Sequence, residues 1–160
     1  MIEKIITRDE LVTVLAERRR TGARVVFTNG CFDLMHIGHT RYLQTARALG
    51  DLLVVGVNAD RSVQALKKGS GRPIVPEAQR AEVIAALACV DYVVPFSEPE
   101  PGRLIAALQP DVLVKGGDWA PDKIIGRDLV EARGGIVRTI PLVPDISTTT
   151  LVQKIHASKC

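Results

Sequence analysis

The sequence has few cysteines and few aromatic residues, and each shortage excludes a class of protein. The three cysteines, Cys31, Cys89 and Cys160, lie far apart and form no Cys-x-x-Cys pair. We therefore expect thiols in a reducing compartment rather than a disulfide framework or a zinc site. Aromatic residues make up only 4% of the chain, so Val, Ile, Leu and Ala must fill most of the core.

The sequence also lacks a long apolar run and a strong charge of either sign. No apolar stretch approaches the ~20 residues of a membrane-spanning helix, and residues 1–11 lack the apolar core of a signal peptide. The net charge is only +3, and its densest basic cluster, residues 18–20, is typical of a solvated helix end. We expect a cytoplasmic protein with neither nucleic acid nor a membrane as a partner.

Short apolar runs alternate with helical patterns along the whole chain. The apolar runs predict five strands, at 24–28, 52–57, 91–95, 111–115 and 136–140. The helical patterns predict helices at 7–22, 38–49, just after 60, 76–87, 101–108, 129–133 and 147–156. Such alternation predicts an α/β fold, a doubly wound Rossmann-like parallel five-stranded sheet with helices on both faces. We expect residues 1–160 to form one domain.

The unusual polar residues follow the predicted strands. Ligands of doubly wound sheets bind at the carboxyl ends of the strands, around the switch point in strand order. Four groups of residues lie there, namely 36–39 after the first strand, 58–68 after the second, 115–119 after the fourth and 147–150 after the fifth. The sequence therefore predicts one ligand site at this edge.

The tetrapeptide HIGH at 36–39 follows a buried strand and an Asn-Gly turn, and it opens a predicted helix. A helix N-terminus attracts phosphate through unpaired N–H groups and a partial positive charge. Residues three apart share a helix face, so His36 and His39 can point at one phosphate. Gly38 would let a ligand or a neighbouring strand approach the backbone. The alternatives are packed histidines or a zinc site completed by Cys31 and Asp33, and the position after the strand favours phosphate.

Two motifs at opposite ends of the chain resemble those of the cytidylyltransferase-like nucleotidyltransferase superfamily. Residues 30–39, GCFDLMHIGH, resemble its GxFDxxHxGH signature, and residues 146–150, ISTTT, resemble its ISSTxIR signature. The resemblance implies in-line attack by a substrate phosphate on the α-phosphorus of a nucleoside triphosphate. Mg²⁺ assists without a dedicated protein metal site, and pyrophosphate leaves. Class I aminoacyl-tRNA synthetases share HIGH, but their KMSKS-type loop and tRNA-binding domains are missing from this sequence.

The resemblance also implies roles for individual residues. His36 and His39 are the expected catalytic donors to the phosphoryl oxygens. The residues expected to bind the nucleotide are Thr28, Asn29, Gly30, Cys31, Phe32, Asp33, Gly38, Ser147, Thr148 and Thr149. Leu151-Val152 stands where the second signature has Ile-Arg, so a usual triphosphate arginine is missing. Lys154 and Lys68 are candidates to replace its charge.

Further stretches resemble the branch of this superfamily that adenylylates D-glycero-β-D-manno-heptose 1-phosphate. They are residues 71–74, 77–80, 90–94 and 114–119. The resemblance implies ATP and a sugar 1-phosphate as substrates, ADP-heptose for the lipopolysaccharide inner core as product, and a possible homodimer. Sugar-phosphate binding is expected from Arg72, Lys115, Asp118 and Trp119, with Lys115 also among the catalytic residues. Arg80 could serve as a surface or ion-pair residue, and Trp119 could instead cover the core.

Other functions stay open at this point. Glycerol 3-phosphate and ethanolamine-phosphate cytidylyltransferases share both signatures, and a catalytically silent nucleotide-binding module is a third possibility. Retention of both His36 and His39 favours an enzyme. In many bacteria the heptose activity is one half of a bifunctional kinase–adenylyltransferase. Here we expect a stand-alone chain, because 160 residues leave no room for a sugar kinase.

Overall fold

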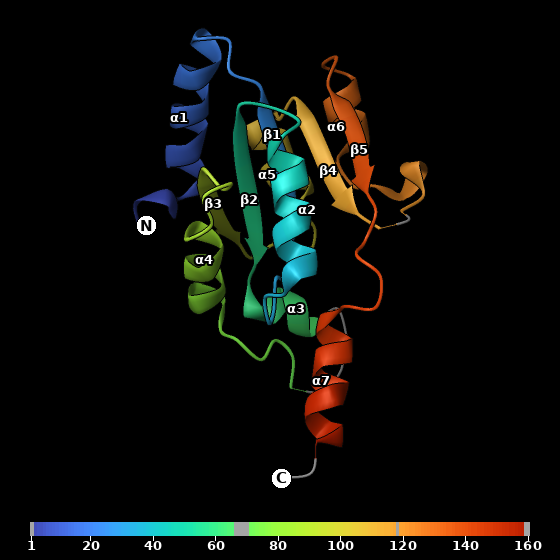
Figure 1. Ribbon diagram of the computed structural model, residues 1–160. Helices are drawn as coiled ribbons and strands as arrows, with labels where there is room; N and C mark the ends of the chain where they lie inside the picture. Colours follow the sequence, from blue (N-terminus) through green and yellow to red (C-terminus); the bar gives the residue numbers. More distant parts are fainter. Residues whose placement is uncertain (1, 66–70, 118, 159–160) are drawn as a thin grey trace.

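A five-stranded sheet runs through the middle of the computed structural model, which describes residues 2–65, 71–117 and 119–158 (Figure 1). The strands are β1 (Val25–Gly30), β2 (Leu52–Asn58), β3 (Tyr92–Phe96), β4 (Val112–Gly116) and β5 (Ile136–Ile140). Their order in the sheet is β3-β2-β1-β4-β5, and every neighbouring pair is parallel. The predicted α/β fold with a parallel five-stranded sheet is confirmed.

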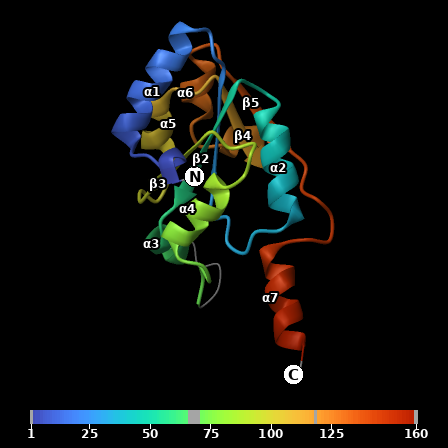
Figure 2. The ribbon, with the colours of Figure 1, turned by 60° about the vertical axis from the view of Figure 1, so that its left-hand side comes forward.

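Helices cover both faces of this sheet, as the alternating pattern predicts (Figure 2). They are α1 (Arg8–Arg20), α2 (Ile37–Arg47), α3 (Asp60–Ala65), α4 (Glu77–Ala85), α5 (Gly102–Leu108), α6 (Arg127–Glu131) and α7 (Thr148–Ala157). Two short 3₁₀ helices that the sequence patterns do not predict are η1 (Ile2–Lys4) and η2 (Pro121–Lys123). Among the described residues, no helix combines the length and apolar character needed to span a membrane.

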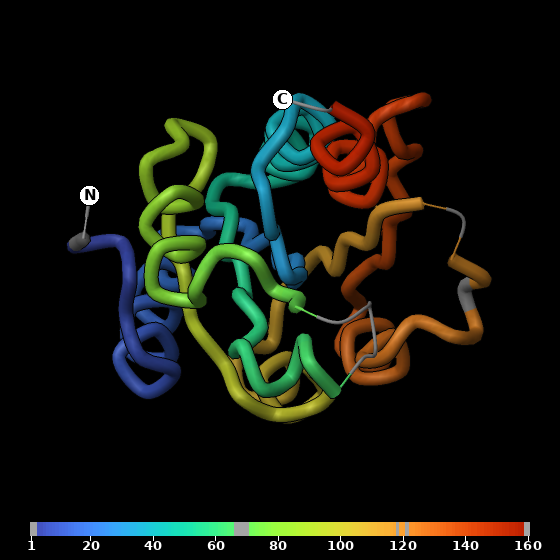
Figure 3. The backbone as a smooth tube through the Cα atoms, turned by 90° about the horizontal axis from the view of Figure 1, so that it is seen from below, coloured from blue at the N-terminus to red at the C-terminus, as the bar shows by residue number. Residues whose placement is uncertain are grey.

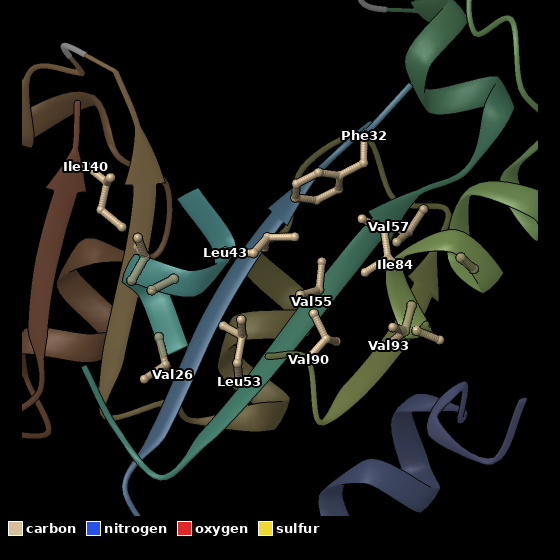
Figure 4. Packing of buried hydrophobic residues seen from close by; sticks show 14 of the residues in the cluster. Val26, Phe32, Leu43, Leu53, Val55, Val57, Ile84, Val90, Val93 and Ile140 are labelled. Carbon is tan, nitrogen blue, oxygen red and sulfur yellow. The ribbon is translucent and has the colours of Figure 1, made fainter. Parts of the chain in front are cut away.

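The core consists of two hydrophobic layers, one on each face of the sheet. In β2, which is buried at every position, Leu53 and Val55 enter the layer beneath α2 and α4, where Leu43 and Ile84 meet them (Figure 4). Neighbouring β2 side chains such as Val54 enter the opposite layer, beneath α1 and α5. Strand side chains alternate between faces, so a strand that is apolar throughout must be covered on both sides.

Carboxylates fix the amino-terminal edge of the sheet. An aspartate stands immediately before each of β2, β3 and β4, and it accepts a hydrogen bond from a backbone N–H at or beside the start of an adjacent strand. These bonds, of 2.7 to 2.8 Å, join Asp51 to Arg24, Asp91 to Leu53 and Asp111 to Val25. They satisfy donors that the ladder leaves unpaired, and they help to set the register.

The carboxyl edge of the sheet is more open. The β1–β4 ladder pairs Val26 with Val112 and Phe27 with Leu113, whereas the β1–β2 ladder continues to Gly30. The view onto this edge shows α2 beside α7, with the ends of β1 and β4 nearby (Figure 3). The strand order reverses at β1, so this edge is the switch point at which ligands of such sheets bind.

We expect Thr7→Ala to lower the free energy of unfolding by about 1 kcal/mol, since Thr7 caps α1. The Thr7 hydroxyl accepts a hydrogen bond from the Glu10 N–H, and the Glu10 carboxylate accepts one from the Thr7 N–H, as the Thr7–Glu10 spacing predicts. Thr13→Ala is the matched control, because Thr13 is exposed inside the same helix. Urea unfolding measures both, and equal stabilities for the two variants would contradict the capping role.

Candidate active site

His36 and His39 cap the N-terminus of α2 together. The Nδ1 atom of His36 accepts a hydrogen bond from the Gly38 N–H at 3.1 Å, and the Nδ1 atom of His39 accepts one from the His36 N–H at 3.4 Å. This reciprocal arrangement is a capping box in which imidazoles replace the usual hydroxyl and carboxylate. The two rings stack with centroids 3.9 Å apart and 27° between their planes.

The capping bonds determine which ring nitrogen carries the proton. A nitrogen that accepts a hydrogen bond holds no proton, so each neutral ring is protonated at Nε2. Burial lowers the pKa of His36, and burial together with the neighbouring His36 lowers the pKa of His39 to about 4, against a raising effect of Asp33. At neutral pH the pair therefore presents two neutral Nε2–H donors.

Gly38 is needed for the histidine cap itself. A Cβ atom at this position would lie 2.9 Å from two ring atoms of His36. The imidazole of His36 is therefore a close neighbour of this backbone, and the approach of a ligand to Gly38 stays a prediction. Any larger residue would displace the ring that donates from Nε2.

Asp33 connects the loop after β1 to two other parts of the chain. Its carboxylate accepts hydrogen bonds from Arg72 Nε at 2.7 Å and from the N–H groups of Ile74 and Val75 at 2.9 and 3.0 Å. Its backbone carbonyl accepts one from the Thr148 hydroxyl at 2.7 Å. The side chain is only 2% exposed. Burial opposes its ionisation, but the three donors outweigh burial and hold the pKa of Asp33 below its usual value.

Lys115 and Asn29 meet where the β1–β4 ladder has ended. The Lys115 ammonium donates to the side-chain oxygen of Asn29. Burial lowers the pKa of Lys115 to about 8. Both residues are predicted site residues from distant parts of the chain, and the fold brings them into contact.

Thr28 lies behind this pair and is fully buried. Its hydroxyl forms a 2.6 Å hydrogen bond with the phenol of Tyr42, whose pKa burial raises to about 12. The side chain of Thr28 therefore fixes α2 to the end of β1, and its nucleotide-binding role stays a prediction. Tyr42 is a supporting residue that the sequence analysis did not identify, because only the packing of α2 on β1 reveals it.

The second motif lies at the N-terminus of α7, beyond the carboxyl edge of the sheet (Figure 1). Ser147 caps this helix, accepting a hydrogen bond from the Thr150 N–H at 3.0 Å, and the Thr149 side chain is exposed. Thr148 donates to the Asp33 carbonyl, 115 residues away in the sequence. The two predicted signatures are thus in direct contact.

The remaining predicted residues differ in burial and in position. Gly30 ends β1, and Cys31 and Phe32 follow it directly. The buried Phe32 packs edge-on against His39 with ring centroids 5.6 Å apart. Trp119 is 54% exposed, so it does not cover the core. Lys154 is exposed near the end of α7. The predictions for Asp118 and Lys68 lie outside the described residues.

Arg80, expected as a surface or ion-pair residue, is a buried ion-pair residue. Its guanidinium is buried and donates to the carbonyls of Val75, Cys31 and Asn58 and to the carboxylate of Asp60. A charged residue at a helical position between Gln79 and Ala81 gave no signal of this burial. Arg80 therefore links α4 to the ends of β1 and β2.

The donor set of the site suits phosphate more than a protein-bound metal. Within residues 2–65, 71–117 and 119–158, no group of three His, Cys, Asp or Glu side chains is placed to hold a metal ion. The imidazole N–H groups, the Lys115 ammonium and the Arg72 guanidinium are instead donors or cations that recognise anions.

Comparison with known proteins identifies the family. The model of the Cytidylyltransferase-like family matches residues 27–156, so the chain belongs to this family. Bifunctional protein HldE of Syntrophotalea carbinolica is 55% identical over 152 residues, which are 95% of this chain and 31% of the relative. Bifunctional protein HldE of Geotalea uraniireducens is 53% identical over 153 residues, which are 96% of this chain and 31% of the relative. The chain thus spans about a third of the length of these curated relatives.

Two solved structures are also similar. The lipopolysaccharide core biosynthesis protein of Thermoplasma volcanium matches with a TM-score of 0.63 and 29% identity, over 76% of this chain and 98% of that protein. Pantothenate synthetase of Thermus thermophilus matches with a TM-score of 0.61 and 18% identity, over 94% of this chain and 70% of that protein. The second likeness shows the fold alone.

We expect acid to destabilise the protein between pH 6.5 and about 4 through His39. In this window an unfolded chain with an ordinary histidine pKa of 6.5 takes up a proton that folded His39, with a pKa of about 4, does not. Protonation therefore favours unfolding, and stability is lost as the pH falls. His36 acts in the same direction. Urea unfolding at several pH values, with NMR titration of the imidazoles, measures the effect.

The matched substitutions are His39→Gln and His156→Gln. His156 is exposed at the end of α7, so its replacement should leave the pH dependence of stability unchanged. His39→Gln should reduce that dependence. A His39 ring that titrates near 6.5 would contradict the depressed pKa.

Proposed function

We propose that residues 1–160 form a nucleotidyltransferase domain that transfers the adenylyl group of ATP to D-glycero-β-D-manno-heptose 1-phosphate. The products are ADP-heptose and pyrophosphate. The observation that carries the proposal is the pair of neutral imidazoles at the start of α2, each held by Nδ1 so that Nε2–H is its donor. Such fixed donors at a helix N-terminus match the charge that develops during transfer between phosphates.

The reaction is a direct displacement at phosphorus. An oxygen of the sugar phosphate attacks the α-phosphorus of ATP, and the bond from that phosphorus to the bridging oxygen of the β-phosphate breaks. His36 and His39 donate from Nε2 to oxygens of the phosphates, and the N–H groups at the start of α7 hold the triphosphate tail. The protein forms no covalent intermediate, since alignment and charge stabilisation are sufficient for this chemistry.

We assign two cations, Lys115 and Arg72, to the attacking phosphate. Lys115 is held by Asn29 at the open carboxyl edge, and Arg72 is held through Nε by the buried Asp33. The terminal guanidinium nitrogens of Arg72 can still donate two parallel hydrogen bonds to a phosphate. Binding both phosphates between these cations and the imidazoles brings the nucleophile and the α-phosphorus together.

Mg²⁺ would supply charge neutralisation on the triphosphate when bound with ATP. Asp33, the carboxylate of the signature loop, already accepts three donors from the protein. A metal held chiefly by phosphate oxygens and water agrees with this use of Asp33 and with the usual coordination of Mg²⁺.

The choice of substrates rests on residues and relatives together. The stretches at 71–74 and 114–119 resemble heptose 1-phosphate adenylyltransferases, and both contribute residues to the carboxyl edge through Arg72 and Lys115. Relatives at 55% and 53% identity named bifunctional protein HldE, and a similar structure named for lipopolysaccharide core biosynthesis, support this choice. Asp118 and Trp119 stay candidates for sugar contacts. The homodimer and the cytoplasmic location also stay predictions.

Pyrophosphate release with ATP and heptose 1-phosphate tests the proposed function. We expect turnover with this pair and little with CTP and glycerol 3-phosphate. The reverse preference would contradict the heptose assignment in favour of the cytidylyltransferase alternative. Absence of turnover with every phosphorylated acceptor would favour a silent nucleotide-binding module.

His39→Ala should lower kcat by about 100-fold, because it removes a fixed donor to the transition state. His156→Ala is the matched control, and we expect full activity from it because His156 is exposed at the far end of α7. Steady-state kinetics on both folded variants measure the difference. Full activity of His39→Ala would exclude the catalytic role.

We expect kcat/KM to fall as the pH rises above about 8, since Lys115 then loses its proton. Its pKa is depressed, so the cation is present below about 8 and absent above it. kcat/KM reports ionisations of the free enzyme. Lys115→Arg keeps the charge and should remove this alkaline decline, whereas Lys123→Arg on the exposed η2 should not. A decline shared by all three proteins would contradict the assignment.

A further inference from the structure

Arg80 is a buried cation with a complete set of partners. Its side chain is 1% exposed, and it forms hydrogen bonds of 2.8 Å to the Val75 carbonyl, 2.5 Å to the Cys31 carbonyl and 2.9 Å to the Asn58 carbonyl. A fourth bond of 2.6 Å reaches the Asp60 carboxylate, which balances the charge. Arg80 projects from α4, whereas its partners belong to three other segments.

Arg80 and Asp33 bind the same two segments from opposite directions. Asp33 belongs to the loop after β1, and its carboxylate accepts from the N–H groups of Ile74 and Val75. Arg80 donates to carbonyls of those same segments, at Cys31 and Val75. The loop containing Cys31 and Asp33 and the segment 72–75 are therefore cross-linked twice, once by an anion and once by a cation. We call these two cross-links together the loop clamp.

The loop clamp determines where Arg72 lies relative to the histidines. Arg72 begins the clamped segment, and its Nε donates to Asp33. Asp33 in turn lies three residues before His36 in the sequence. The histidine side of the site has further supports, since Gly38 holds His36 and Thr148 holds the Asp33 carbonyl. Asp33 and Arg80 both tie segment 72–75 to the histidine loop.

We infer that Arg80 is a positioning residue for the phosphate acceptor. It acts by holding segment 72–75, and hence Arg72, at a fixed position against the loop that carries the histidines. The inference rests on the proposed function, because it assigns the attacking phosphate to Arg72. Arg80 itself touches no substrate.

Loss of stability alone does not distinguish a structural role from a positioning role. Removing one partner of a buried ion pair is strongly destabilising, because the groups left behind lose their donor. What the guanidinium adds is geometry, since its rigid fork reaches several acceptors in a fixed arrangement. A lysine can donate to only part of this set, so the conservative change is itself informative.

The test compares Arg80→Met and Arg80→Lys with the wild-type protein and with Arg103→Met, an exposed position on α5. We expect both Arg80 variants to raise KM for the sugar phosphate about 10-fold or more, the loss expected for a hydrogen bond to a charged group. KM for ATP should change by less than about 3-fold, because the histidine side keeps its own supports. Arg103→Met should behave as the wild-type protein does. If Arg80→Met does not fold, Arg80→Lys carries the comparison.

Hydrogen exchange supplies a readout that needs no substrate. The Ile74 and Val75 amides, which donate to Asp33, should exchange at least about 10-fold faster in Arg80→Lys, while the Gly38 amide should not change. Equal increases in both KM values, or unchanged exchange at Ile74 and Val75, would overturn the inference.

The two proposals fail in different ways. A wild-type protein that turns over no sugar phosphate counts against the proposed function. Wild-type turnover combined with an unchanged acceptor KM in the Arg80 variants counts against the positioning role alone.

Discussion

The buried carboxylate of Asp33 is the constraint on which the rest of the site depends. A carboxylate this deep in the protein is stable only if hydrogen bonds replace its hydration, and it accepts three, from Arg72, Ile74 and Val75. Its own carbonyl accepts a fourth bond, from Thr148. Satisfying one buried group thus brings together the loop after β1, segment 72–75 and the start of α7. The hydrogen bonds that compensate for burying this charge therefore also hold distant segments together.

The two histidines also satisfy backbone groups while they build the site. The N-terminus of α2 leaves N–H groups without partners, and the Nδ1 atoms of His36 and His39 accept from two of them. The same bonds fix the tautomer, so each ring keeps Nε2–H as its donor. Burial lowers both pKa values, and the neighbouring His36 lowers that of His39 further, so the rings stay neutral. Helix capping and the proposed donation to phosphate are therefore two uses of one geometry.

Much of the fold follows from patterns that can be read along the chain. The apolar residues 52–57 predict a strand buried on both faces, and β2 is that strand. The Thr7–Glu10 spacing predicts the capping box of α1. The predicted strand at 136–140 has the observed bounds of β5. These features depend on local spacing and on burial period, which the sequence expresses directly. The short 3₁₀ helices carry no such period and could not be predicted.

For this protein the sequence by itself determined the order of elements, the parallel α/β class and the two motifs that contain His36, His39 and Thr148. Only the tertiary structure decided which polar side chains are buried behind the carboxyl edge of the sheet and what they bond to. Thr28 lies behind the site because α2 packs Tyr42 against it, and Arg80 is buried because α4 lies over the ends of β1 and β2. The physical reason is that hydrogen-bond partners of buried polar groups come from segments far apart in the sequence. No local pattern records which of those segments will meet.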